Sequence, residues 1–453
     1  MKILSRTVTF HLGWTTGSYA VVQGFRLINN VVLARLLAPE LFGIMLIVNT
    51  LRTGVELLSD IGIGQNIVSN KEGETPEFYN TAWTLQVLRG ILLSLLCLAA
   101  SIPVSRFYGD DVFSRIMPAV AFFFLFAGFQ STGRFLLQKR LGLKKLGIFE
   151  IGVAAVSTAA HIVFAYYSPT IWALVYGGLF SAVIAMIGSF FLVRDMRHRF
   201  SFSRRYTQQI LSFGKWIFLS SIVYFLATNF DRLFLARSIP FQLLGLYGVA
   251  RSLSDMLSLL VARIGNLIIF PMIAAANHSR EVLRERLATN RIKILLAAAA
   301  FVSLFVSVSD LVVFILYDDR YRAAAFMLPI LAIGIWFSIL CTIGESVLFG
   351  IARPAFVAIS NMAKLGWLLA GLPLAVAYYG IPGAVCVAAT ADLVRYLPLW
   401  RSQRNECLSF GMQDFLMTIV MFAMIAAWRT LFWTMGITEG FAEWWSLADL
   451  LQM

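Results

Sequence analysis

Long, mainly apolar runs constrain this chain more than any other feature. The run "IKILLAAAAFVSLFVSVSDLVVFIL" covers residues 292–316, and "ILLSLLCLAASIPV" covers residues 91–104. A helix needs about 20 mainly apolar residues to cross the roughly 30 Å hydrocarbon core of a bilayer. Transmembrane strands would instead alternate apolar and polar residues over segments of about ten, and no such alternation appears. With 59% hydrophobic and only 13% charged residues, the sequence predicts an all-α polytopic membrane protein.

Polar breaks between the apolar runs predict thirteen membrane spans. The N-terminal "MKILSRTVTFHLGWTTG" has no compact apolar core followed by a cleavage site, so it is predicted to begin the first span. The tail from Gly436 to Met453 is too polar for a further span, and its paired Trp444 and Trp445 suit an interfacial helix. The predicted spans are residues 8–36, 41–68, 80–104, 113–138, 146–167, 170–193, 211–237, 243–275, 288–317, 324–350, 355–378, 382–400 and 412–435.

The basic residues are distributed unevenly between the two sides that these spans define. One set of alternating loops collects twenty-one lysines and arginines, and the other set collects five. Positive residues concentrate in cytoplasmic loops, so the asymmetry predicts a cytoplasmic N-terminus. The formal charge of +13 is thereby explained by topology and anionic lipid, and no nucleic-acid partner is expected.

One short helix-to-helix corner occurs twice. "LARLLAPELFG" runs from Leu33 to Gly43, and "LARSIPFQLLG" follows at a constant spacing of 202 residues, from Leu235 to Gly245. The basic segment "VRDMRHRFSFSRRYTQQ" lies between the sixth and seventh predicted spans, where two halves would meet. The sequence therefore predicts two pseudo-symmetric six-helix lobes related by parallel duplication around a central cavity. The predicted boundaries are residues 1–198, residues 199–405, and an extra span with its tail at residues 406–453.

Motifs of soluble enzymes are missing from the sequence. It contains no GxxxxGK[ST] phosphate loop and no HExxH zinc motif, so an ATPase domain is excluded and no catalytic residue, cofactor or metal is predicted. The four cysteines are scattered, without metal or redox spacing, and are interpreted as small apolar residues. Transport would have to be driven by a gradient or by a partner.

Ionisable residues within the predicted spans are the candidate functional groups, because such residues are costly in a membrane and are functional by default. Arg52, Glu56 and Asp60 recur at steps of four, which places them on one helix face, and Arg251 and Asp255 repeat this spacing in the second half. Such pairs could also be structural. Because guanidinium groups bind phosphate oxygens bidentately, a cationic cavity suits an anionic ligand. The predicted substrate-binding residues are Arg26, Arg52, Arg89, Arg251, Arg263 and Lys364, and the predicted ion-coupling residues are Glu56, Asp60, Asp255 and Glu345.

Residues near predicted span ends receive a different interpretation. Arg134, Glu150 and Arg395 are expected to extend toward the membrane surface rather than to line a cavity.

The stretch Val31 to Asn70 resembles the opening of bacterial polysaccharide-transporter proteins, the Wzx-type oligosaccharide flippases of the multidrug/oligosaccharidyl-lipid/polysaccharide (MOP) exporter superfamily. The matching features are the corner from Leu33 to Gly43 and the sequence Asp60, Gly62 and Gly64. Residues 78–96, "FYNTAWTLQVLRGILLSLL", resemble the third span of members associated with exopolysaccharide export. The resemblance implies a MATE-like fold of two lobes whose cavity faces each side in turn.

The resemblance also implies a function. The substrate would be a polyprenyl-diphosphate-linked oligosaccharide moved from the cytoplasmic to the periplasmic leaflet for exopolysaccharide or O-antigen synthesis. Other partners would be membrane lipid, a polysaccharide polymerase and a chain-length regulator. Two alternatives stay open, a drug/cation antiporter of the same superfamily and a non-transporting membrane partner of a polymerase. Many cavity arginines facing a constant head group predict strict recognition of the lipid diphosphate and loose recognition of the distal sugars.

Overall fold

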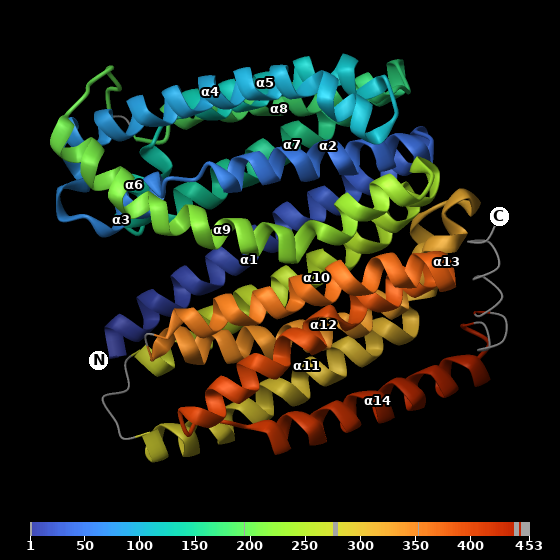
Figure 1. Ribbon diagram of the computed structural model, residues 1–453. Helices are drawn as coiled ribbons and strands as arrows, with labels where there is room; N and C mark the ends of the chain where they lie inside the picture. Colours follow the sequence, from blue (N-terminus) through green and yellow to red (C-terminus); the bar gives the residue numbers. More distant parts are fainter. Residues whose placement is uncertain (1, 194, 275–279, 352, 439–443, 445–453) are drawn as a thin grey trace. The chain divides into compact units, whose positions relative to one another are not determined.

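The structure is a computed structural model in which every regular element of the described residues is a helix (Figure 1). It describes the backbone of all residues except 1, 194, 275–279, 352, 439–443 and 445–453. Side chains are not described for residues 2–12, for 213, 215–217 and 219, or for 260–290 apart from Arg284 and Ala288. The all-α polytopic fold predicted from the sequence is confirmed.

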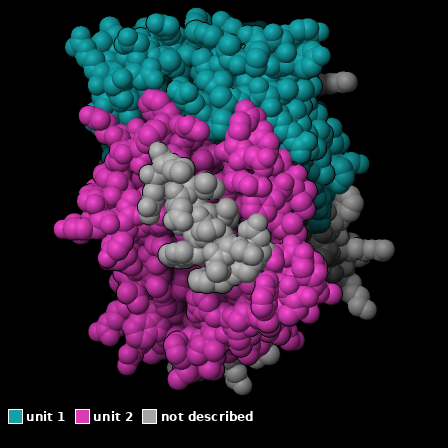
Figure 2. All heavy atoms as spheres, turned by 90° about the vertical axis from the view of Figure 1, so that its right-hand side faces the viewer, with its two compact units in different colours: residues 1–225 teal, residues 226–453 magenta. Residues whose placement is uncertain are grey.

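The chain forms two compact units, Met1–Phe225 and Leu226–Met453, coloured separately in Figure 2. The division falls inside one long helix, α9, Arg204–Ser238. This division groups residues by their packing and not by the internal repeat. The predicted lobe boundaries at residues 198 and 405 therefore stay a prediction.

Unit 1 contains eight α-helices before α9 and a short 3-10 helix. Its main packing is between α4 and α5, between α1 and α7, and between α7 and α8. The helices are α1 (Lys2–Leu36), α2 (Pro39–Leu58), α3 (Ile63–Ser69), η1 (Lys71–Glu74), α4 (Pro76–Tyr108), α5 (Val112–Phe129), α6 (Gly133–Lys139), α7 (Leu143–Tyr167) and α8 (Ile171–Phe190).

Two spans predicted to be continuous are interrupted. The predicted span 41–68 is wrong because α2 ends at Leu58 and α3 begins at Ile63; the predicted span 113–138 is wrong because α5 ends at Phe129 and α6 begins at Gly133. At the first interruption Gly62 has φ +68°, a left-handed conformation that favours glycine, and its N–H donates to Asp60 Oδ1 at 3.0 Å. Asp60 therefore lies beyond the end of α2 and does not continue its helical face.

Unit 2 contains the rest of α9 and the long helices after it. In it α12 packs against α10, α11 and α13, and α11 also packs against α14. Gly380, at φ +60°, bends α13 between the two spans predicted at 355–378 and 382–400. The helices are α10 (Phe241–Ala274), α11 (Arg280–Leu316), η2 (Asp319–Tyr321), α12 (Arg322–Gly350), α13 (Pro354–Asn405) and α14 (Gly411–Thr434).

The repeated corner has the same backbone geometry in both units. The N–H of Leu37 donates to the carbonyl of Leu33 at 2.9 Å, and the N–H of Ile239 donates to the carbonyl of Leu235 at 3.0 Å. The donor and the acceptor of the second bond each lie 202 residues after those of the first, and both leucine acceptors are buried. A helix therefore ends, turns and restarts in the same way in each unit, as the sequence repeat predicts.

Helix α14 is an integral part of unit 2. Near its start Asp414 forms a buried ion pair with Arg291 of α11, and near its end Arg429 Nη1 lies 2.7 Å from Oδ2 of the buried Asp310 of α11. Between them the indole of Trp336, on α12, donates to Thr418 at 2.8 Å. The predicted extra span at 412–435 thus has buried polar contacts at both ends. Trp444 stacks on Phe326 with ring centres 4.9 Å apart, and Trp445 lies outside the described residues.

Nine helices within the described residues are long and apolar enough to cross a membrane. They are α2, α4, α5, α7, α8, α11, α12, α13 and α14, with α13 long enough for two predicted spans. Helices α1, α9 and α10 are 34 or 35 residues long but are not among these nine. The chain is a multi-pass membrane protein, and crossing by those three helices stays a prediction.

Candidate functional site

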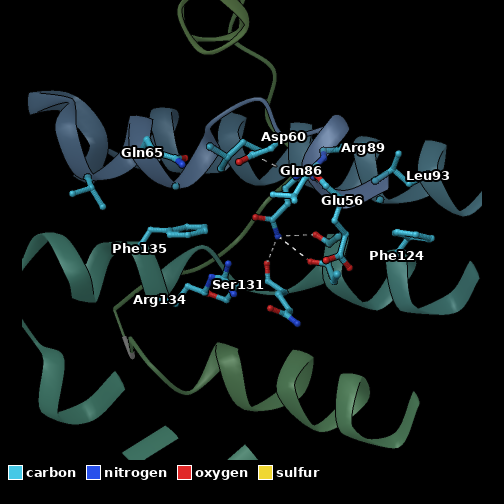
Figure 3. A pocket seen from close by; sticks show the side chains of 18 of the residues that line it. Glu56, Asp60, Gln65, Gln86, Arg89, Leu93, Phe124, Ser131, Arg134 and Phe135 are labelled. Atoms are coloured by element: carbon cyan, nitrogen blue, oxygen red, sulfur yellow. Dashed lines mark hydrogen bonds and ion pairs between the residues drawn. The ribbon is translucent and has the colours of Figure 1, made fainter. Parts of the chain in front are cut away.

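A cavity of about 720 Å³ opens in unit 1 where α2 and α5 are interrupted. It is lined by the end of α2, by α3, by the middle of α4, by the end of α5 and by α6 (Figure 3). Four charged side chains line it, Glu56, Asp60, Arg89 and Arg134. Glu56, Asp60 and Arg89 were predicted to be functional, and the structure brings them together from two separate segments of the chain. Arg134, from α6, also lines the cavity, so the prediction that it does not is wrong.

Arg89 holds the broken end of α2 in place. Its Nη2 donates to the carbonyl of Glu56 and, at 2.9 Å, to the hydroxyl of Ser59, and its Nε donates to the same hydroxyl at 3.0 Å. Its Nη1 also lies 3.9 Å from Asp60 Oδ1. A cation at the C-terminus of a helix is stabilised by the helix dipole and satisfies its last carbonyls. Most of the hydrogen-bonding capacity of Arg89 is therefore used within the protein.

Gln86, one turn before Arg89 on α4, performs the same task for α5. Its Nε2 donates to the carbonyls of Ala127, Gly128 and Gln130, at 3.3, 3.0 and 2.8 Å. The free carbonyls at a helix end must find donors, so one turn of α4 stabilises both interruptions. The sequence analysis did not identify Gln86, although its spacing from Arg89 placed both on one helix face.

Among the predicted basic residues of the spanning helices, Arg52 has the fewest hydrogen-bond and ion-pair partners. The comparison covers the residues whose side chains the structure describes. Its Nε lies 4.0 Å from Glu56 Oε1, beyond hydrogen-bond distance, and has no hydrogen-bond partner among the described residues. Its guanidinium carbon lies 4.9 Å from the centre of the Phe123 ring, a cation–π arrangement. Arg26 lies exposed on α1. The Arg52 side chain is 30% exposed, so its Nη groups, and not the buried Nε, are the donors that a ligand could reach.

Charged residues of α9 and α10 form one network in unit 2. Arg251 Nε lies 3.3 Å from Asp255 Oδ1 and 3.6 Å from Oδ2 of the buried Asp231, and Arg232 forms a second ion pair with Asp255. The hydroxyl of Tyr247 donates to Asp231. The predicted pair of Arg251 and Asp255 is thus part of a four-charge cluster, whose two acids match its two bases.

A second network connects α12 with both arms of α13. Lys364 Nζ donates to Asp392 Oδ1 at 2.9 Å, and Arg395 pairs with Glu345 and approaches Asp392 at 3.5 Å. The prediction that Arg395 extends toward the membrane surface is wrong: it is 8% exposed, because two acids of its own unit hold it inside. Asp392 was not singled out from the sequence, although it is an acid within a predicted span.

These contacts change the interpretation of the candidate charges. The sequence predicted a cationic cavity, in which bases outnumber acids. In the two unit 2 networks four acids pair with four bases, so these networks carry no excess of positive charge. The side chain of Arg263 lies outside the described residues. Among the residues that are described, no group of three acidic, histidine or cysteine side chains could hold a metal ion.

The segment between α8 and α9 is attached to the surface of α4. Three of its backbone N–H groups, those of Arg199, Ser201 and Ser203, donate to Asn80, Thr84 and Thr81 at 3.0, 3.0 and 3.3 Å. These side chains form a polar stripe on α4 that supplies acceptors to a segment without regular secondary structure.

His198 fixes the same segment beside the cavity. Its ring stacks on Trp83 with centres 5.0 Å apart, and its Nε2 lies 2.7 Å from Oγ of Ser131, which lines the cavity. Burial lowers the pKa of His198 to about 4, because a charged imidazolium is poorly solvated among aromatic rings. The imidazole is therefore neutral at neutral pH.

Known proteins with similar sequences include two that are named as biosynthesis proteins. The lipopolysaccharide biosynthesis protein WzxC of Escherichia coli (strain K12) is 24% identical over 60% of this chain and 55% of its own length. The teichuronic acid biosynthesis protein TuaB of Bacillus subtilis (strain 168) is 23% identical over 61% of this chain and 58% of its own length. The matched segment thus spans little more than half of each relative.

Solved structures show the same fold at low sequence identity. The lipid II flippase MurJ, in an inward closed conformation, superposes with a TM-score of 0.73 and 13% identity, over 99% of this chain and 97% of its own. An inward-facing MATE multidrug resistance transporter of the MOP superfamily gives a TM-score of 0.64 and 16% identity, over 85% and 94% of the two chains.

A sequence profile identifies the family of this chain. The profile describes polysaccharide biosynthesis proteins and matches residues 32–326, almost two thirds of the chain, including the first corner, the unit 1 cavity and the second corner. This chain belongs to the polysaccharide biosynthesis protein family.

Proposed function

We propose that the protein is a flippase that moves a polyprenyl-diphosphate-linked oligosaccharide from the cytoplasmic to the periplasmic leaflet by alternating access. The observation that carries the proposal is the partly exposed guanidinium of Arg52, which makes no hydrogen bond among the described residues, and whose one ion pair is at 4.0 Å, although it belongs to a helix apolar enough to span a membrane. Family membership and the fold shared with a lipid II flippase support it. In this proposal the protein is not an enzyme.

Arg52 and Arg26 are proposed as the main contacts of the diphosphate. A guanidinium presents paired N–H donors that match two phosphate oxygens, and charge-assisted pairs are strongest where water is scarce. The other described bases of the predicted set, Arg89, Arg251 and Lys364, already hold acids or carbonyls of the protein. They would shape the path of the substrate, while Arg263 remains proposed as a contact from the sequence alone.

Movement would be driven by an ion gradient. The acids proposed for coupling to protons or sodium are Glu56, Asp60, Asp255 and Glu345. Asp255 and Glu345 are held in ion pairs, so their protonation would release a basic partner and change helix packing. The protein would lie in a bacterial inner membrane with a cytoplasmic N-terminus, and a polysaccharide polymerase and a chain-length regulator are proposed as partners.

Transport by the full-length protein in sealed vesicles tests this function. A polyprenyl diphosphate that carries a fluorescent sugar is incorporated, and a membrane-impermeant quencher reports the fraction of sugar in each leaflet. We expect transbilayer movement with the wild-type protein, and at least tenfold slower movement with Arg52→Ala. Arg52→Lys should recover only part of the rate, because an ammonium does not bind two oxygens in the plane of a guanidinium.

Glu74→Gln is the control, because Glu74 lies outside the cavity in an exposed pair with Arg140. It should transport at the wild-type rate. Absence of movement with the wild-type protein, or full activity of Arg52→Ala, would contradict the proposal.

A further inference from the structure

We infer that the unit 1 cavity binds an uncharged sugar, the one attached directly to the diphosphate. The inference rests on the proposed flippase function and assigns a separate part of the substrate to a separate site. Glycan recognition would lie at the interruptions of α2 and α5, while the diphosphate is bound by Arg52, which does not line this cavity.

The charges of the cavity are balanced, which disfavours an anion or a metal ion as its ligand. Glu56 and Asp60 oppose Arg89 and Arg134, and Arg89 is already occupied by Ser59 and a helix carbonyl. A phosphate group would be repelled by the two acids. A metal ion would find only these two carboxylates, one of them 3.9 Å from an arginine. A neutral polar ligand avoids both penalties.

The polar groups that remain free match the chemistry of sugar hydroxyls. The side-chain amides of Gln65, Gln130 and Gln138 line the cavity and have no hydrogen-bond partner among the described residues. The Glu56 side chain is 44% exposed, and its one ion pair is at 4.0 Å. A hydroxyl both donates and accepts, so it can donate to a carboxylate while it accepts from an amide. A hydrogen bond to a charged group is also stronger than a neutral one.

Aromatic rings supply the apolar part of such a site. Phe124, on α5, and Phe135, on α6, both line the cavity (Figure 3). The guanidinium carbon of Arg134 lies 4.6 Å from the ring centre of Phe135. The C–H face of a sugar ring packs on an aromatic face, while its hydroxyls reach groups at the edge. The volume of about 720 Å³ lies within the range of about 300–1,000 Å³ that is typical of small-ligand pockets.

The spacing along α2 connects the cavity to the diphosphate contact. Arg52 and Glu56 are four residues apart on one helix face, a rise of about 6 Å. This rise is comparable to the length of one sugar unit. A diphosphate bound at Arg52 would therefore place the first sugar beside Glu56. Sugars further along the glycan would lie beyond the residues that bind the first sugar.

Binding of two lipids to the full-length protein in nanodiscs tests the inference. The probes are polyprenyl diphosphate alone and the same lipid carrying a single glucose. We expect the wild-type protein to bind the glucose-bearing lipid at least tenfold more tightly. Glu56→Gln should remove about tenfold of that preference, and Phe135→Ala should reduce it, while the affinity for the sugar-free lipid changes by less than twofold. Arg52→Gln should weaken both lipids equally, and Glu74→Gln should change neither.

The outcomes separate the inference from the proposed function. If the wild-type protein binds both lipids equally, or if Glu56→Gln weakens both to the same extent, the sugar does not occupy this cavity and the inference is overturned. If neither lipid binds to the wild-type protein, the proposed function itself fails. Thermal unfolding of each variant must match the wild type, and Glu56→Asp, which keeps the charge, provides a second variant at this position.

Discussion

Lys364 Nζ donates to Asp392 Oδ1 at 2.9 Å and connects the two arms of α13 across the bend at Gly380. Both side chains are largely buried, at 7% and 15% exposure. Arg395 and Glu345 form the neighbouring pair, so the cluster of two acids and two bases is neutral, and it becomes charged when a single member is removed. A buried charge that loses its partner is strongly destabilising, whereas removal of a whole pair is often tolerated.

Lys364→Met should therefore destabilise the protein by about 3–5 kcal/mol, because one acid is left without a matching base. The double variant Lys364→Met with Asp392→Leu should recover most of this loss, since Arg395 and Glu345 still balance each other. Unfolding midpoints in detergent measure both effects. Glu72→Gln, in the exposed pair with Arg205, should cost less than about 1 kcal/mol. A double variant as unstable as the single one would argue against charge balance as the cause.

Asp414→Asn should loosen α14 from α11. The substitution keeps the shape of the side chain but leaves the buried Arg291 without its acid, at a cost of about 3–5 kcal/mol. Thermal stability measured by size-exclusion chromatography of the heated protein should fall. The matched control is Asp319→Asn, because Asp319 is 91% exposed and its pair with Arg322 contributes little. Unchanged stability of Asp414→Asn would mean that α14 is held by apolar packing alone.

Acidification should release the segment between α8 and α9 from α4. The pKa of His198 is lowered to about 4, so the attached segment binds fewer protons than the released one, and attachment weakens as the pH falls from about 6.5 toward 4. Hydrogen exchange at the amides of Arg199, Ser201 and Ser203, corrected for intrinsic rates, should show falling protection between pH 6.5 and 5, above the range where most carboxylates titrate.

His198→Gln is the control for this pH effect. Glutamine can still bond to Ser131 but does not titrate. Its protection should be independent of pH over the same range. A pH-dependent loss of protection that persists in His198→Gln would show that another group is responsible.

Gly90→Ala should be strongly destabilising because α4 and α5 touch at this residue. An added Cβ would lie 2.7 Å from Gly128 Cα and 2.7 Å from the Phe124 carbonyl oxygen, both of them backbone atoms that cannot rotate away. We expect a loss of about 1–3 kcal/mol or more. Gly152→Ala, on α7 with no atom within 4 Å of its added Cβ, should be neutral or stabilise by up to about 1 kcal/mol. Similar unfolding midpoints for the two variants would contradict the close contact of these helices.

The sequence alone was sufficient for the helical membrane fold, because long apolar runs have one stable arrangement in a bilayer. It also located the repeated corner, since Leu33 and Leu235 are followed by the same short turn and the same buried face. Arg52, Glu56, Arg89 and Lys364 could be singled out because charge within an apolar run is costly. These inferences depend only on composition and on spacing along one helix.

The tertiary structure decided which charges remain available. Nothing local distinguishes Arg52, whose Nε has no hydrogen-bond partner among the described residues, from Lys364, which is held by an acid 28 residues further along the chain. The interruptions of α2 and α5 likewise depend on Gln86 and Arg89, donors from another helix that satisfy the broken ends. Hydrophobicity along the chain reports the preference of each segment for the membrane. Partners for buried polar groups come from segments distant in sequence, so only the folded chain determines them.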